Sequence, residues 1–154
     1  MMATPATNQS RFKNLWAGYG AALWALIFAA LHVVWAAGWY IGLQEEQARR
    51  AFQQTWFLVY DLVAAMICAL GVIVALAFVQ LWGQHLSRRL LSIFAWCGTG
   101  LLVLRGAAGI IKIIYLAAIG RSILDPMALW DVWFCLGAVL FSLMIWQFRH
   151  VNYI

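Results

Sequence analysis

Four long apolar segments divide this chain, and they restrict its fold more than any other feature. They extend over residues 15–43, 56–82, 90–119 and 127–147. A transmembrane helix needs about 20 consecutive apolar residues. A spanning segment must also satisfy its backbone hydrogen bonds without water, which a helix does internally. We therefore predict an all-α protein, an integral membrane bundle of four transmembrane helices.

The composition supports this prediction. The chain has 154 residues, of which 66% are hydrophobic and 10% charged. A domain of this size has too little interior to bury so much apolar surface, so a lipid bilayer is its expected partner. The net charge of +5 comes from residues scattered in short loops. It does not form a nucleic-acid-binding patch, and we predict no nucleic acid partner.

The segments define one domain with two short tails. Residues 1–14 form a polar tail, residues 15–147 the transmembrane domain, and residues 148–154 a second tail. The first apolar run is far longer than the 7–15 apolar residues of a signal peptide, which indicates a helix that is not cleaved.

The connection at residues 44–55 is expected to be partly helical. It contains two acid-to-base pairs at a spacing of four residues, Glu45 with Arg49 and Glu46 with Arg50. Such pairs stabilise a helix.

The lysines and arginines predict the orientation. With the N-terminus inside, the inner loops and tails hold Arg11, Lys13, Arg88, Arg89 and Arg149, and the outer loops hold Arg49, Arg50 and Arg121. Because cytoplasmic loops carry an excess of these residues, the bias favours N-in and C-in. We expect a bacterial inner (cytoplasmic) membrane protein with both tails in the cytoplasm.

Each predicted helix carries a stripe of small residues with an ionisable member. The stripes are Gly18, Ala22, Ala25, Ala29, His32, Ala36 and Trp39; Asp61, Ala64, Cys68, Gly71 and Ala75; Gly98, Leu102, Arg105, Gly109 and Lys112; and Asp131, Cys135, Ala138 and Ser142. Membrane helices pack through small residues. The ionisable residues are therefore expected to face other helices.

The polar residues also share a depth, at the centre or in the outer half of the bundle. This predicts a polar pocket open to the outer face, with Arg105 as its floor. The candidate ligand-binding residues are His32, Trp35, Trp39, Asp61, Arg105, Lys112, Trp130 and Asp131. Each also has a structural alternative. The histidine could bond a neighbouring helix, the arginine could fix the register between helices, and the lysine could extend to the membrane edge. The aspartates could cap helix starts, and the aromatic residues could form a belt at the membrane interface.

Several chemistries are unsupported by the sequence. A haem held by two histidines needs a pair at matched depth, and His85 and His150 both lie at the inner ends. No C-x-x-C motif supports a thiol relay, and no metal-ligand spacing is present. A pair of intramembrane aspartates, Asp61 and Asp131, would permit an aspartyl hydrolase. The residues that flank them lack the asparagines expected around such a site. We predict no cofactor and no metal, and whether the protein is an enzyme stays open.

The residues of three predicted helices carry a resemblance to a known family. His32-x-x-Trp35-x-x-Gly38, Leu104-Arg105-Gly106 with Gly109, and Trp130-Asp131 resemble, in order and spacing, the bacterial family named domain of unknown function 3995. The resemblance implies a four-helix membrane protein in which His32, Trp35, Arg105 and Asp131 are marked positions. It implies no activity.

Three classes of function fit these observations. The first, which the predicted pocket favours, is a membrane protein that binds a small anionic or amphipathic ligand. The second is an accessory or scaffolding subunit that packs against a membrane-protein partner. The third is a small oligomeric transporter, which would need a path to the inner face through an apolar half. The oligomeric state is left open.

Overall fold

The computed structural model describes residues 16–120 and 126–152, which form helices joined by short connections. The elements are α2 (Trp16–Ala36), α3 (Glu45–Phe52), α4 (Thr55–Val79), the 3-10 helix η1 (Leu81–His85), α5 (Arg88–Ala118) and α6 (Pro126–Asn152). Four of them, α2, α4, α5 and α6, are long and apolar enough to cross a membrane. This confirms the prediction of an all-α, multi-pass membrane protein with four candidate transmembrane helices.

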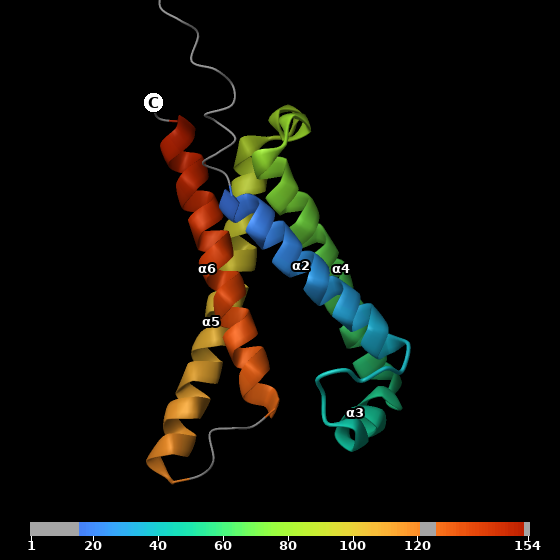
Figure 1. Ribbon diagram of the computed structural model, residues 1–154. Coiled ribbons are helices and arrows are strands. Elements are labelled where there is room, and N and C mark those ends of the chain that lie inside the picture. Colours follow the sequence, from blue (N-terminus) through green and yellow to red (C-terminus); the bar gives the residue numbers. More distant parts are fainter. Residues whose placement is uncertain (1–15, 121–125, 153–154) are drawn as a thin grey trace, which may run out of the picture.

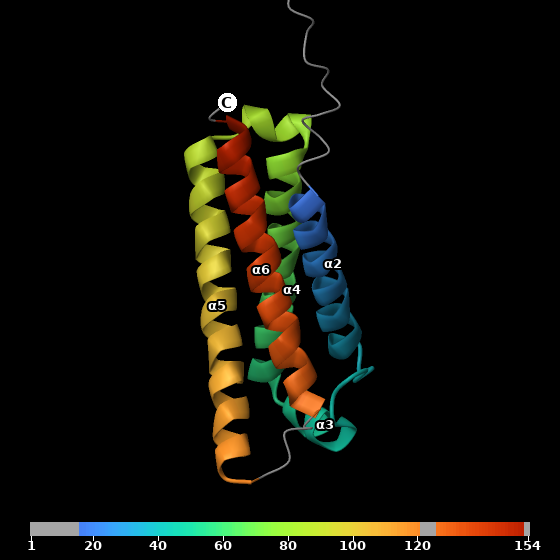
Figure 2. The same ribbon diagram turned by 60° about the vertical axis from the view of Figure 1, so that its left-hand side comes forward.

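The four long helices alternate in direction and form two pairs (Figures 1 and 2). Helix α2 packs mainly against α4, and α5 mainly against α6, while the pairs meet chiefly through α2 and α6. In the view of Figure 1 the two pairs diverge toward the end that carries α3. We call this end the α3 end, and the opposite end, where η1 lies, the η1 end.

Small residues allow these helices to approach closely. A Cβ atom on Gly137 of α6 would lie 2.5 Å from the ring of Trp24 on α2, so only glycine fits there. The Trp24 ring is 5% exposed, and its N–H donates a hydrogen bond of 3.0 Å to the carbonyl of Trp133. Close packing of this kind is what joins helices in lipid, where the hydrophobic effect between them is absent.

The predicted stripes mark the buried faces well in α2 and less well in α6. Gly18, Ala22, Ala25 and His32 are all buried. In α6, by contrast, Ser142 at the end of the stripe is exposed. The buried residues there are the larger Phe141, Met144 and Ile145. They fill the space beside α2, where Phe141 contacts Trp24 at a centroid distance of 6.3 Å.

Helix ends differ from the ends of the apolar segments. Helix α2 ends at Ala36, although the apolar run continues to Leu43. Gly38 and Gly42 have φ angles of 93° and 76°, a left-handed conformation that glycine adopts without strain and that ends a helix. Helix α6, in contrast, continues to Asn152, beyond the predicted end at Gln147. No glycine or proline follows Gln147 to stop it.

The short helix α3 confirms the prediction that the connection at residues 44–55 is partly helical. Arg49 donates a hydrogen bond of 2.7 Å to Glu45, and Arg50 one of 2.9 Å to Glu46. Both pairs are exposed, so they stabilise α3 only slightly.

Candidate functional site

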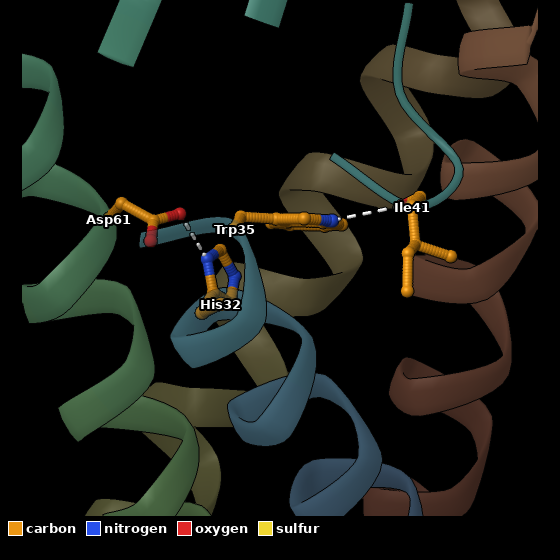
Figure 3. A network of polar contacts seen from close by, with 4 residues as sticks. All are labelled: His32, Trp35, Ile41 and Asp61. Carbon is orange, nitrogen blue, oxygen red and sulfur yellow. Dashed lines mark hydrogen bonds and ion pairs between the residues drawn. The ribbon is translucent and has the colours of Figure 1, made fainter. Parts of the chain in front are cut away.

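Two groups of ionisable side chains join neighbouring helices, one in each helix pair. In the first, Nδ1 of His32 on α2 lies 2.7 Å from Oδ1 of Asp61 on α4 (Figure 3). His32 is 8% exposed and Asp61 3% exposed. His32 is one turn before the end of α2, and Asp61 lies in the second turn of α4, which places the pair toward the α3 end.

The His32 ring is held by aromatic neighbours on its own helix. Phe28 and Trp35 meet it edge to face, at centroid distances of 4.7 and 5.0 Å. These residues lie four positions before and three after His32, so a helix places all three on one face. Trp35 is itself held, because its N–H donates a hydrogen bond of 2.9 Å to the carbonyl of Ile41 (Figure 3).

The second charged group joins α5 to α6. Nη1 of Arg105 donates a hydrogen bond of 2.7 Å to Oδ1 of Asp131, and Nζ of Lys112 lies 3.0 Å from Oδ2 of the same carboxylate. The Asp131 side chain is 2% exposed, whereas those of Arg105 and Lys112 are 45% and 38% exposed. A single buried carboxylate is therefore shared by two half-exposed cations.

Two glycines of α5 make room for this contact. A Cβ atom on Gly109 would lie 2.5 Å from Cβ of Asp131, and one on Gly106 would lie 3.0 Å from Sγ of Cys135. The two glycines are therefore positions at which α6 approaches α5 closely. The spacing of Arg105 and Gly109 thus has a physical reason, because Gly109 makes room for the carboxylate that Arg105 binds, while Gly106 makes room for Cys135.

An aromatic contact connects the two charged groups across the bundle. The Arg105 guanidinium lies 4.7 Å from the centroid of the Phe134 ring on α6, and Phe134 packs at 5.2 Å against Phe28 on α2. Phe28 in turn contacts His32. A series of ring contacts, through Phe134 and Phe28, therefore leads from Arg105 to His32.

The structure brings together seven of the eight candidate residues, in two groups rather than in one. The ionisable candidates form the two groups described above. The rings of Trp35 on α2 and Trp130 on α6 contact each other at a centroid distance of 5.1 Å. Trp39 lies apart, 70% exposed in the turn after α2. Phe28 and Phe134 are added by the structure. Phe28 is signalled by its spacing of four from His32, but the role of Phe134 depends on which helices are neighbours.

Two tryptophans hold the turn after α2 over this region. Trp35 binds the carbonyl of Ile41, and Trp130 donates a hydrogen bond of 2.9 Å to the carbonyl of Gly42. A Cβ atom on Gly42 would lie 2.8 Å from the Trp130 ring, so the turn rests directly on that ring. The tryptophans thus bind neighbouring carbonyls from two different helices.

Replacing Trp130 with phenylalanine should loosen this turn. The ring remains but the hydrogen bond to Gly42 is lost, which removes about 1 kcal/mol. Amide hydrogen exchange in residues 39–44 should accelerate about five-fold. Trp56→Phe is the control, because the Trp56 N–H bonds only the nearby side chain of Gln54. Equal exchange in wild type and Trp130→Phe would show that Trp130 does not hold the turn.

In the ranges that the structure describes, no three histidine, cysteine, aspartate or glutamate side chains are grouped as metal ligands.

The fold and the site thus define a small multi-pass protein with four candidate transmembrane helices, a histidine–aspartate pair in one helix pair and an arginine–aspartate–lysine group in the other. The family described as Protein of unknown function (DUF3995) matches residues 25–141, and the chain belongs to this family. This confirms the resemblance carried by the His32, Arg105 and Asp131 motifs. Neither a curated protein nor a solved structure matches the chain.

Proposed function

We propose that this protein binds the anionic group of a small amphipathic molecule at Arg105, between its two helix pairs. The observation that carries the proposal is that the guanidinium of Arg105 is half-exposed and only partly paired. Arg105 lies near the middle of the 31-residue helix α5, and its side chain is 45% exposed. One of its N–H groups bonds Asp131, a carboxylate that Lys112 shares.

The remaining N–H groups of Arg105 require acceptors that lipid tails do not offer. A guanidinium has five N–H donors, and a charged side chain at the bilayer centre costs at least about 2.5–3.5 kcal/mol. Its planar fork suits the two oxygens of a carboxylate or phosphate. An anionic headgroup would therefore offset the part of this free-energy cost that the ion pair with Asp131 leaves uncompensated.

The surroundings of Arg105 suit the apolar part of such a ligand. Phe134 lies against the guanidinium, and Phe28, which packs on Phe134, contacts Trp130 at 6.1 Å. Aromatic faces of this kind pack well against rings and alkyl chains. In the proposal Lys112 and Asp131 complete the anion site, while His32, Asp61 and Trp35 face the ligand from the other helix pair.

We further propose that the site opens to the outside of a bacterial inner membrane, with both termini in the cytoplasm. Arg88, Arg89 and Arg149 all belong to the η1 end, as the positive-inside rule requires of a cytoplasmic face. The exposed Glu45 and Glu46 of α3 would then lie outside. A reporter enzyme fused after Ile154 that is active only in the cytoplasm would support this orientation.

Two other functions use the same residues differently. In an accessory subunit, a carboxylate from a partner helix would take the place of the ligand at Arg105. A transporter would need polar groups toward the η1 end as well. Among the buried residues of the described chain, only Thr99 is polar there, and its hydroxyl donates a hydrogen bond of 2.7 Å to Ala95 of its own helix. We therefore favour binding over transport.

Native mass spectrometry of the protein, gently extracted from its own membrane, tests the proposal. We expect a bound anionic amphiphile that Arg105→Leu loses, with affinity for the re-added molecule falling about 10- to 100-fold for one lost charge-assisted bond. Arg49→Leu is the matched control, because it removes an exposed arginine paired within α3. It should retain the molecule.

Two results would contradict the proposal. Retention of the amphiphile by a folded Arg105→Leu protein would place its site elsewhere. A second polypeptide in place of a small molecule, lost in the same variant, would identify an accessory subunit.

A further inference from the structure

We infer that His32 is a proton acceptor, whose Nε2 atom takes a proton from a carboxyl or hydroxyl group of the bound amphiphile. Asp61 is the positioning residue that holds the opposite side of the imidazole ring. The inference deepens the proposed function and rests on it for the identity of the proton donor. The state of the imidazole in the absence of ligand is a separate matter that can be measured directly.

The geometry orients the imidazole. Nδ1 of His32 lies 2.7 Å from the carboxylate of Asp61, so an ionised Asp61 accepts a hydrogen bond from Nδ1–H. In a neutral imidazole only one nitrogen carries hydrogen, so the lone pair is then on Nε2. A carboxylate that accepts from one ring nitrogen selects the tautomer in which the other is a base, and it stabilises the imidazolium that forms.

Nε2 points away from the carboxylate. In Figure 3 the nitrogen next to Asp61 is joined to it by the dashed line, and the second ring nitrogen is on the opposite side. Phe28 and Trp35 hold the ring in this orientation from both directions along α2. Within residues 16–120 and 126–152, Nε2 has no hydrogen-bond partner.

The carboxylate of Asp61 is also incompletely satisfied. Its Oδ2 atom is buried and accepts no hydrogen bond from the described residues, although the side chain is only 4% exposed. Buried polar atoms are nearly always paired, and an unpaired one is costly. Every distribution of protons over this pair leaves a polar atom without a partner. A pair of this kind is therefore built to meet an additional proton-bearing group.

The proton balance needs no further reactant. The O–H bond of the ligand breaks, its electron pair stays on the ligand oxygen, and an N–H bond forms at Nε2. The products are an imidazolium paired with the Asp61 carboxylate and a ligand anion, which suits Arg105 on the facing pair. Among the described residues, Asp61 from α4 is the ionisable group that meets the ring. Helix α6 contributes the uncharged Trp130 and Phe134 next to Phe28.

Solid-state NMR of protein with ¹⁵N-labelled histidine, in phosphatidylcholine bilayers, tests this inference. The chain has three histidines, and the signals lost in His32→Gln identify the site. At neutral pH without ligand, we expect His32 as the neutral tautomer, protonated at Nδ1. Lauric acid, used as the probe, should convert it to the imidazolium. Dodecyltrimethylammonium, which has the same chain and no acidic proton, should not.

Asp61→Asn separates a positioning role from a merely structural one. Asparagine keeps the shape of the side chain but loses the negative charge, so the Nδ1–H tautomer should lose its preference and lauric acid should no longer form the imidazolium. Thr99→Val, which removes a buried hydroxyl that bonds only within α5, should behave as wild type.

Three outcomes would overturn the inference. They are an Nε2–H tautomer in the ligand-free protein, an imidazolium present with or without the probe, and binding of lauric acid that leaves the His32 signals unchanged. In the last case the proposed function survives, because laurate binding is measured separately by native mass spectrometry. Absence of laurate binding would contradict the proposed function for carboxylates, while the tautomer of the ligand-free protein would still decide the state of His32.

Discussion

Replacing Asp131 with alanine is expected to lower the free energy of unfolding by about 3 kcal/mol, the largest loss from any single change at this site. The Asp131 carboxylate is 2% exposed and is shared by Arg105 and Lys112. Its removal leaves two cations in the membrane without that counter-charge. We expect the lower end of the usual range for broken buried pairs, because both cationic side chains are half-exposed and can reach toward the membrane edge.

Equilibrium unfolding in mixed micelles, followed by circular dichroism, measures this loss. The double variant Arg105→Met with Asp131→Ala should recover part of it, because one of the two cations is then gone. Thr99→Ala is the control, since it removes a buried polar group outside both charged groups and should cost about 1 kcal/mol. A loss in Asp131→Ala no greater than in the control would show that the ion pairs do not hold α5 to α6.

A second large effect is expected at Gly109, where a single methyl group should separate the same two helices. In Gly109→Ala, the new Cβ would lie 2.5 Å from Cβ and 2.6 Å from Cγ of Asp131. Both atoms are close to the α6 backbone, so the helices must shift. Overpacking of this kind costs about 1–3 kcal/mol. The shift also lengthens the 2.7 Å bond between Arg105 and Asp131, so ligand affinity should fall as well.

Gly100 provides the matched control on the same helix. A Cβ atom there meets nothing within 4 Å. Gly100→Ala should therefore be neutral or stabilise the protein by up to about 1 kcal/mol, because alanine favours a helix over glycine. If the two variants unfold alike, then α6 does not approach α5 at Gly109 in the way described.

The separation of the charges into two groups suggests how the site works. His32 and Asp61 belong to the α2–α4 pair, and Arg105, Lys112 and Asp131 to the α5–α6 pair. Each group therefore stabilises contacts within a pair. The contact between the groups is aromatic, through Phe28 and Phe134. A ligand bound between Phe28 and Phe134 would displace this aromatic contact without breaking either ion pair.

Much of the site could be predicted because membrane burial of polar residues is costly. His32, Asp61 and Asp131 were expected to face other helices, and each is buried. That Arg105 forms the floor of a pocket stays a prediction: its guanidinium contacts Phe134, and its side chain is 45% exposed. Trp39 is a candidate in the sequence because it continues the stripe of the first predicted helix beyond His32 and Ala36. Gly38, in a left-handed conformation, follows the end of α2, so Trp39 lies in the exposed turn instead of on the helix.

The sequence by itself determined the number, type and approximate extent of the membrane helices. It could do so because the thickness of a bilayer and the cost of unpaired backbone groups act on each segment separately. Only the tertiary structure decided that Asp61 pairs with His32, and Asp131 with Arg105 and Lys112. At similar depth every acid could reach several bases, and the choice depends on which helices are neighbours. That choice follows from contacts such as Trp24 on Gly137 and Asp131 on Gly109, which join residues far apart in the chain and exist only when the bundle is assembled.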